Sequence, residues 1–380
     1  MTFDLIIKDG TIIDPSQNLI KKKDVGISGG KIASVKDYIS ESDGVQIIPA
    51  RGKYITAGLI DLHVHVWWGV AHLAIPADPV CIGRGVTTAI DAGSSGANTF
   101  PGFYHYVIEQ THTRILAFLH ISGMGQLDND IGELEDIRWA RVDRAVEMSD
   151  LYKDAIVGIK VRLSSDIVGK NDLFAFGKAL EAGVELNKPL MIHVGGSIHP
   201  IEKFLEQLRP GDIVTHAFTG RPNGIVDNNG RVIDAAKDAI KRGVIFDVGH
   251  GAGSFSFDIA EKCLEEGILP GTISSDVHKY NVNGPVHDLL TTLSKFLYLG
   301  LGIEEVVKLS TVNPSSAIGM DQKIGTLNVG ADADVAIIDP IEKKITLTDS
   351  EGEIRVGNTL LVPVTTLKKG NIFVASPNML

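Results

Sequence analysis

The most informative shortages in this 380-residue sequence are of cysteine, of long apolar runs and of positive charge. Only two cysteines occur, Cys81 and Cys263, which argues against a disulfide scaffold and suits the reducing cytoplasm, where we expect the protein to reside. No apolar run approaches the roughly 20 residues of a membrane helix, and the N-terminus lacks a signal-peptide pattern. A membrane is therefore not an expected partner.

Basic residues are outnumbered by acidic ones: the sequence has 36 Lys and Arg against 47 Asp and Glu, which gives a net charge of −11. Nucleic acids and anionic membranes are bound by clustered Lys and Arg, so a nucleic-acid partner is not expected. We interpret the one basic run, Lys21-Lys22-Lys23, as a solvated hairpin tip. The hydrophobic fraction of 44% is ordinary for a globular protein, and the length suits one large domain with a small one.

The two ends of the chain, residues 1–55 and 323–380, are predicted to be short strands joined by tight turns. Asp9-Gly10 and Gly29-Gly30 supply the positive φ angles that two-residue hairpins need. Neither end alone contains many strands. We expect both to combine into one small β domain, a sheet or a β-sandwich, which would place the termini side by side.

Residues 56–322 have a different sequence pattern, in which short Val- and Ile-rich runs alternate with segments of helical periodicity. Such alternation predicts a parallel sheet, because each parallel pair needs a crossover. Eight units over about 260 residues match an α/β fold with a closed (β/α)8 TIM barrel, and a doubly wound open sheet is the alternative. The predicted strands are residues 58–66, 86–92, 114–122, 156–163, 189–194, 213–217, 244–248 and 272–276.

Side chains that bind metals lie at the ends of these strands. In Asp61-Leu62-His63-Val64-His65 the alternation of a strand places both histidines on one face, which in a barrel is the interior. Two imidazoles placed in this way form half of a metal site. Four more polar residues end the fourth, fifth, sixth and eighth strands: Lys160, His193, His216 and Asp276. Any one could be a satisfied core group, but burying all six would be costly without partners.

Lys160 requires a separate argument, because an ammonium group repels metal ions. Reaction of a lysine amine with CO2 gives a carbamate, which is chemically a carboxylate and can bridge two cations. The alternative is that Lys160 pairs with a carboxylate and that only one metal binds.

This set of six residues resembles the metal-ligand pattern of the amidohydrolase superfamily, in its binuclear branch with a carboxylated lysine. Residues 58–61, 311–314 and 325–335 agree with that family, and the resemblance covers nearly the whole chain. It implies two Zn²⁺ ions bridged by carboxylated Lys160, one also held by His63, His65 and Asp276 and the other by His193 and His216. Mn²⁺, Fe²⁺ or Co²⁺ would suit the same ligands. The resemblance also implies attack by a metal-bridging hydroxide, with Asp276 as general acid and base.

Substrate contacts are predicted from neighbouring positions. Arg162 lies two residues beyond Lys160 on the same inward face, where it would clamp a substrate carboxylate or pair with a loop acid. His278, two residues beyond Asp276, would orient substrate or cap the strand. His250 ends the seventh strand and Asn223 lies in a loop after His216, so both are expected to line the pocket.

The chain most resembles a subgroup often labelled dihydroorotase-like or adenine-deaminase-like, through residues 158–162 and 193–196. Its characterised members look like deacetylases of small acylated carboxylates, including O-acetyl α-hydroxy acids, so this resemblance implies amide or ester deacylation of a small carboxylate-bearing molecule. Cyclic-amide hydrolysis, purine deamination and a non-catalytic scaffold role remain alternatives. Barrels of this kind commonly self-associate, and a homo-oligomer is expected.

Overall fold

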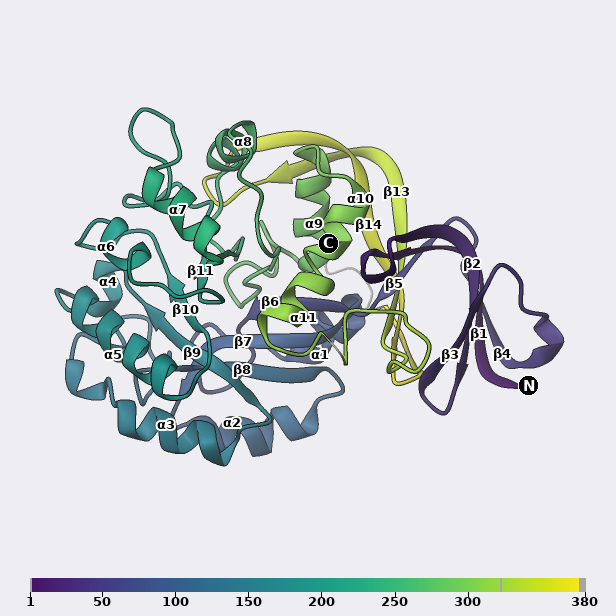
Figure 1. The fold of residues 1–380 in the computed structure, drawn as a ribbon, viewed down its shortest axis with the longest axis horizontal. Helices are drawn as coiled ribbons and strands as arrows, with labels where there is room; N and C mark the ends of the chain where they lie inside the picture. Colours follow the sequence, from purple (N-terminus) through teal and green to yellow (C-terminus); the bar gives the residue numbers. More distant parts are fainter. Residues whose placement is uncertain (1, 322, 376–380) are drawn as a thin grey trace.

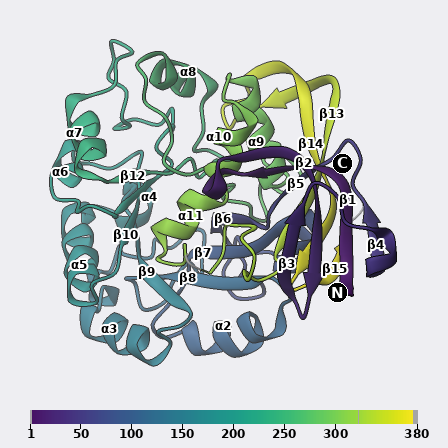
Figure 2. The same ribbon diagram turned by 45° about the vertical axis from the view of Figure 1, so that its right-hand side comes forward.

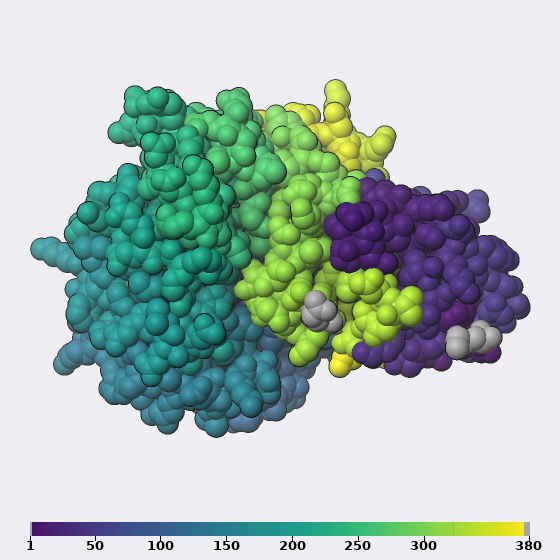
Figure 3. Space-filling model, viewed as in Figure 1, coloured from purple at the N-terminus to yellow at the C-terminus, as the bar shows by residue number. Residues whose placement is uncertain are grey.

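The computed structural model describes residues 2–321 and 323–375, and in it the two ends of the chain form one mixed β-sheet (Figure 1). The strand order is β15-β14-β13-β5-β1-β2-β3, with β4 paired to β1. Antiparallel pairing of Val335 with Ala57 joins the two ends, and Figure 3 shows the purple N-terminal segment packed beside yellow-green C-terminal residues. The strands are β1 Phe3–Asp14, β2 Leu19–Ser28, β3 Lys31–Lys36, β4 Gly44–Pro49, β5 Tyr54–Ala57, β13 Val335–Thr348, β14 Ile354–Lys368 and β15 Asn371–Val374.

The hairpin predicted at Gly29-Gly30 is confirmed, because β2 and β3 pair across it and both glycines have positive φ. The hairpin predicted at Asp9-Gly10 is wrong. β1 continues through these residues, with a register shift between Ile7 and Gly10 that marks a β-bulge. Lys21-Lys22-Lys23 is likewise not a hairpin tip, since it lies within β2 and pairs with β1.

Seven parallel strands, β6 to β12 in sequence order, form the second sheet. Isolated bridges from Thr272 to Asp247 and from Val277 to Val64 connect the predicted eighth strand to both edges of this sheet. The barrel is therefore closed through bridges rather than through a regular eighth strand. The strands are β6 Leu59–Val64, β7 Val86–Gly96, β8 Arg114–His120, β9 Ile156–Arg162, β10 Leu190–His193, β11 Ile213–Thr215 and β12 Ile245–Phe246.

The helices surround this barrel, and the terminal sheet lies at its side (Figure 2). None of the helices in the described ranges is long and apolar enough to cross a membrane. They are α1 Ala77–Val80, α2 Phe100–Tyr106, α3 Val142–Leu151, α4 Ser165–Val168, α5 Asp172–Glu185, α6 Glu202–Leu205, α7 Asp234–Arg242, α8 Phe257–Glu265, α9 Leu289–Tyr298, α10 Ile303–Lys308 and α11 Val312–Ala317.

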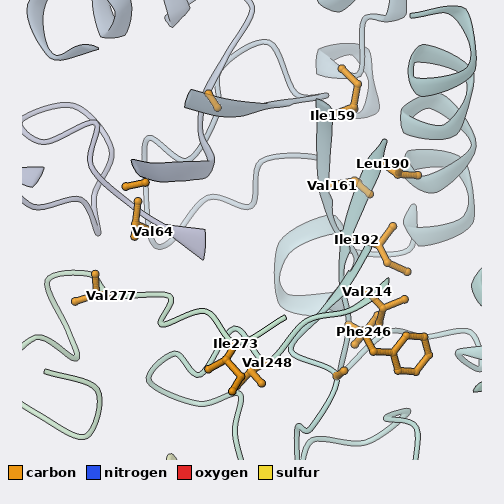
Figure 4. Close-up of a cluster of buried hydrophobic side chains, with 14 of the residues drawn as sticks. Val64, Ile159, Val161, Leu190, Ile192, Val214, Phe246, Val248, Ile273 and Val277 are labelled. Carbon is orange, nitrogen blue, oxygen red and sulfur yellow. The ribbon is translucent and has the colours of Figure 1, made fainter. Parts of the chain in front are cut away.

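Alternation along the barrel strands separates two apolar clusters. Ile159, Val161 and Ile192 belong to the main cluster, which includes residues of the surrounding helices (Figure 4). Met191 and Phe118 belong to a second cluster. Because Met191 pairs with Lys160 and lies two residues before His193, this second cluster fills the barrel beneath those polar side chains. The polar side chains at the strand ends therefore rest on a layer of packed apolar residues inside the barrel.

Candidate metal centre

The structure brings all six predicted ligands together in the wall of one cavity of about 160 Å³. Ligand atoms of His63, His216 and Asp276 all lie within 4.8 Å of one another. His65 Nε2 is 3.2 Å from Asp276 Oδ1, and the rings of His193 and His216 are 4.3 Å apart. His216 and Asp276 both have positive φ angles, 64° and 49°, which turn their side chains inward just beyond their strands. Such angles are costly for residues with a Cβ and concentrate at functional sites.

Hydrogen bonds on the far side of the rings fix which nitrogen faces the cavity. The Thr215 hydroxyl donates its proton to Asp247 Oδ2 at 2.7 Å, so it can only accept from His63 Nδ1 at 2.8 Å. His216 Nδ1 donates to the carbonyl oxygen of Gly249 at 2.6 Å. Both rings therefore carry their proton on Nδ1 and present the Nε2 lone pair to the cavity, which is the arrangement of a metal-bound histidine.

The donor set fits a divalent cation. Burial lowers the pKa of His63 and His65 well below the usual range, so both rings are neutral. Asp276 Oδ1 lies 3.4 Å from His63 Nε2 and has no hydrogen-bond partner in the part of the chain that the structure describes. Lone pairs therefore face one another across a buried gap, which is unfavourable unless a cation lies between them. Ligand atoms of a tetrahedral zinc site are about 3.3 Å apart, close to these separations.

Lys160 is fully buried, and its Nζ has no hydrogen-bond partner among the described residues. Burial lowers its pKa from 10.5 to about 7, so the amine is readily available in its neutral form. Gly93 lets this side chain pass, because a Cβ there would lie 2.6 Å from Lys160 Cγ. An unpaired amine that shares the cavity with four candidate-ligand histidines fits a group that is completed by CO2 and metal ions.

Two of the four predicted substrate residues, Arg162 and His278, line the same cavity. Arg162 Nη1 lies 3.5 Å from Glu133 Oε1, so the loop acid weighed in the sequence analysis is present, yet Arg162 Nε remains buried without a partner. His278 Nδ1 accepts from the backbone N–H of Tyr280, and burial lowers the pKa of His278 to about 4. The neutral ring therefore carries its proton on Nε2 and is a hydrogen-bond donor.

The other two predicted substrate residues do not line the cavity. Asn223 has a positive φ and donates from Nδ2 to the carbonyl oxygen of Ser197, which makes it part of a loop turn. His250 is fully buried, stacks on Phe255 and bonds Lys295 Nζ through Nε2. Strand position alone could not distinguish this ring from one facing the cavity, because its partners come from distant segments.

Sequence reasoning missed three polar residues that line the cavity, Gln126, Arg221 and Ser254. Arg221 lies in the loop that was singled out for Asn223, and its side chain approaches Gly195 and Gly196. These glycines therefore make room for an arginine rather than leaving open space. Gln126 follows β8 in a loop and had no signal of its own in the sequence.

Comparison with known proteins agrees with this geometry. The profile of the amidohydrolase family matches residues 54–373. The chain is 38% identical to a deacetylase of Agrobacterium fabrum over 87% of this chain and 82% of that protein, and 35% identical to a deacetylase of Enterococcus faecalis over 98% and 100%. A crystal structure of a dihydroorotase superposes with a TM-score of 0.92 at 34% identity, covering 98% of each chain.

Proposed function

This chain belongs to the amidohydrolase family, and we propose that it is a zinc-dependent deacetylase of small, carboxylate-bearing substrates. The observation that carries the proposal is the single cavity in which six ligand side chains meet two arginines and a donor histidine. Two relatives named deacetylases, matched over most of their length, favour acyl transfer to water over other reactions of such sites.

We assign the ligand roles from the resemblance to the amidohydrolase family, since all six side chains line the one cavity. His63, His65 and Asp276 would hold one Zn²⁺, His193 and His216 would hold a second, and the carbamate of Lys160 would bridge both. Bound divalent ions supply Lewis-acid catalysis and lower the pKa of water toward neutrality. Mn²⁺, Fe²⁺ or Co²⁺ would be accepted by the same nitrogen and oxygen ligands.

Asp276 is the proposed general acid and base. Its backbone N–H donates to the carbonyl oxygen of His63, and its own carbonyl accepts from Asn281 Nδ2, so the residue is held on both sides. In hydrolysis the water oxygen adds to the acyl carbon while the Asp276 carboxylate takes the proton. The bond from the acyl carbon to the leaving nitrogen or oxygen then breaks, and that atom receives the proton from Asp276.

Arg162, Arg221 and His278 are the proposed substrate-binding residues. All three offer N–H donors, and both guanidinium groups are cationic, so together they favour an anionic oxygen group on the substrate. The small volume of the cavity further favours a small acylated acid over a bulky ligand.

The test is product analysis with the zinc-loaded protein on a panel of N-acetyl amino acids, O-acetyl hydroxy acids, dihydroorotate, hydantoins and adenine. Acetate and ammonia are followed together. We expect acetate from the acetylated acids, with a raised KM in Arg162→Met. Ring opening without acetate would identify a cyclic amidohydrolase instead, and ammonia from adenine would identify a deaminase. No turnover of any compound would contradict the proposed substrate class and favour a non-catalytic protein on this fold.

A further inference from the structure

Glu133, the acid that pairs with Arg162, is a buried residue to which the mechanism assigns no role. It lies in the loop that follows β8, and its side chain is only 4% exposed. Its Oε1 lies 3.5 Å from Nη1 of Arg162. Burying a carboxylate is costly, and the guanidinium beside it offsets part of that cost.

The ion pair uses only part of each side chain. Glu133 Oε2 and Arg162 Nε are both buried, and neither has a hydrogen-bond partner among the described residues. A pair that served stability alone would be expected to join two N–H groups to two oxygens, since bidentate pairs are the strong ones. Glu133 instead contacts Nη1, which lies on the other side of the guanidinium from Nε. This contact leaves the edge formed by Nε and Nη2 for a second carboxylate.

The position of Arg162 directs that edge to the candidate metal centre. Arg162 lines the cavity, and it pairs with the candidate ligand His193 in the register of β9 and β10. A carboxylate bound by Arg162 would therefore share the cavity with the groups that carry out the chemistry. The guanidinium thus lies between two sites for anions, a buried one filled by Glu133 and a second one on the cavity side.

The backbone on both sides of Glu133 is fixed to the segment that follows Arg162. The N–H of Leu134 donates to the carbonyl oxygen of Ile167 at 3.3 Å. Gly132 permits this close approach, because a Cβ there would lie 2.2 Å from the same oxygen. Ile167 belongs to α4, which follows the strand that ends at Arg162. The acid and the arginine are therefore held by one strand–helix unit.

We propose that Glu133 is a positioning residue, which holds Arg162 through Nη1 so that the Nε–Nη2 edge binds the carboxylate of the substrate. The proposal rests on the proposed deacylase function and applies equally to amide and ester substrates. The two carboxylates lie on different sides of the guanidinium, whose charge between them offsets their repulsion. Without the charge of Glu133 the guanidinium is less firmly held, so the substrate carboxylate binds more weakly.

The test measures kcat and KM of the zinc-loaded enzyme for O-acetyllactate and N-acetylalanine, in both configurations. The same compounds with a carboxamide in place of the carboxylate serve as uncharged analogues. Glu133→Gln should raise KM for the acids roughly 5- to 50-fold with little change in kcat, and should leave KM for the uncharged analogues unchanged. Glu135→Gln is the matched control, because it makes the same change at an exposed position of the same loop. An unchanged KM for the acids, or an equal rise for acids and analogues, would overturn the proposal.

A double-mutant cycle separates positioning from a structural role. If Glu133 acts through Arg162, Glu133→Gln should have no further effect on KM in an Arg162→Met background. A further rise as large as that in the wild type would overturn the proposal. If Glu133→Gln does not fold, Glu133→Asp gives the same test. It keeps the buried charge but withdraws the carboxylate by one C–C bond, so it should raise KM for the acids alone.

Calorimetry in an Asp276→Asn background separates the role of Glu133 from the deacylase function. This protein should bind the acids more tightly than their uncharged analogues, and adding Glu133→Gln should reduce that preference. The same result without acetate release by the wild-type enzyme would refute only the deacylase function. Equal binding of acids and analogues, no binding of either, or a preference that Glu133→Gln leaves intact would refute the role of Glu133.

Discussion

Replacing Thr215 with valine is the sharpest test of how this site holds metal. The Thr215 hydroxyl links Asp247 Oδ2 at 2.7 Å to His63 Nδ1 at 2.8 Å, and all three residues are buried. Valine has nearly the same shape but no hydroxyl. The substitution therefore removes the acceptor that keeps the His63 proton on Nδ1, without opening a cavity at the site.

Two effects follow from this geometry. His63 Nδ1–H is left buried and unpaired, and Asp247 loses one of three hydroxyl donors, the others being Thr272 and Ser274. We expect the metal-free protein to lose about 1–3 kcal/mol of unfolding free energy. The ring of His63 is then free to rotate or change tautomer, and loss of such outer partners typically lowers metal affinity by about 10- to 100-fold.

The assay is zinc affinity by chelator competition under bicarbonate, combined with thermal unfolding of the metal-free protein. Thr215→Ser keeps the hydroxyl and should retain wild-type affinity. Thr292→Val removes a buried hydroxyl from α9, where it contacts only the carbonyl of Asp288, and should leave metal affinity unchanged. If Thr215→Val bound zinc with wild-type affinity, or if Thr292→Val lost as much zinc affinity as Thr215→Val, the hydroxyl of Thr215 would not control zinc binding through the His63 tautomer.

Three other predictions concern the ligands. Asp276→Asn should lower acetate release by at least about 10²-fold while metal analysis still finds bound ions, and normal turnover would remove Asp276 from the mechanism. Gly93→Ala should reduce the metal content, because the added Cβ would collide with the Lys160 side chain and displace it. Gly52→Ala is the control, since Gly52 also has a positive φ but its Cβ would meet open space, and it should keep the wild-type metal content. Equal metal contents in the two variants would contradict a steric collision between residue 93 and Lys160. At fixed CO2 pressure, zinc loading of the metal-free protein should rise with pH through neutrality, because burial lowers the pKa of Lys160 to about 7 and the neutral amine adds CO2 to form the carbamate with release of one proton. Loading that falls as the pH rises, or that ignores CO2, would contradict this.

The barrel strands and the meeting of six candidate ligands in one cavity could be predicted from the sequence, because their signals are local. Val- and Ile-rich runs end at Lys160 and His193, and the structure places β9 and β10 within one or two residues of the predicted runs. The eighth strand was predicted as regular, but Asp276 has a φ of 49° and its segment joins its neighbours only through isolated bridges. A left-handed residue at a strand end is set by distant contacts that periodicity does not report.

The errors have the same origin. Asp9-Gly10 has the composition of a hairpin turn, but Gly10 packs against Ile55 of β5, and pairing with this parallel strand favours a bulge in a continuous β1. His250 lies at a strand end like the true cavity residues, yet Lys295 on α9 turns its ring away from the site. Gln126 carries no local pattern at all, and only the folded loop reveals that its amide is buried and unpaired.

Three buried aspartates explain how unpaired ligands can be tolerated. Asp61 accepts from the backbone and hydroxyl of Ser275, which precedes Asp276, and Asp91 accepts from the backbone of Val66, which follows His65. Asp247 completes the set through Thr215. Each carboxylate is satisfied by protein donors, while burial raises the pKa of Asp61 to about 7 and that of Asp91 to about 6.

The buried polar atoms of the site therefore differ in whether the protein supplies their hydrogen-bond partners. The aspartates beneath the candidate ligands find their partners within the chain, whereas Lys160 Nζ, His193 Nε2 and Asp276 Oδ1 have none among residues 2–321 and 323–375. A folded protein keeps such atoms unpaired only when surrounding bonds hold them and an external partner completes them. The three aspartates hold the residue next to Asp276, His65 and His216, which restrains the chain beside these three candidate ligands. This uneven pairing supports the proposal that bound ions and substrate complete the site, which the buried aspartates hold in place.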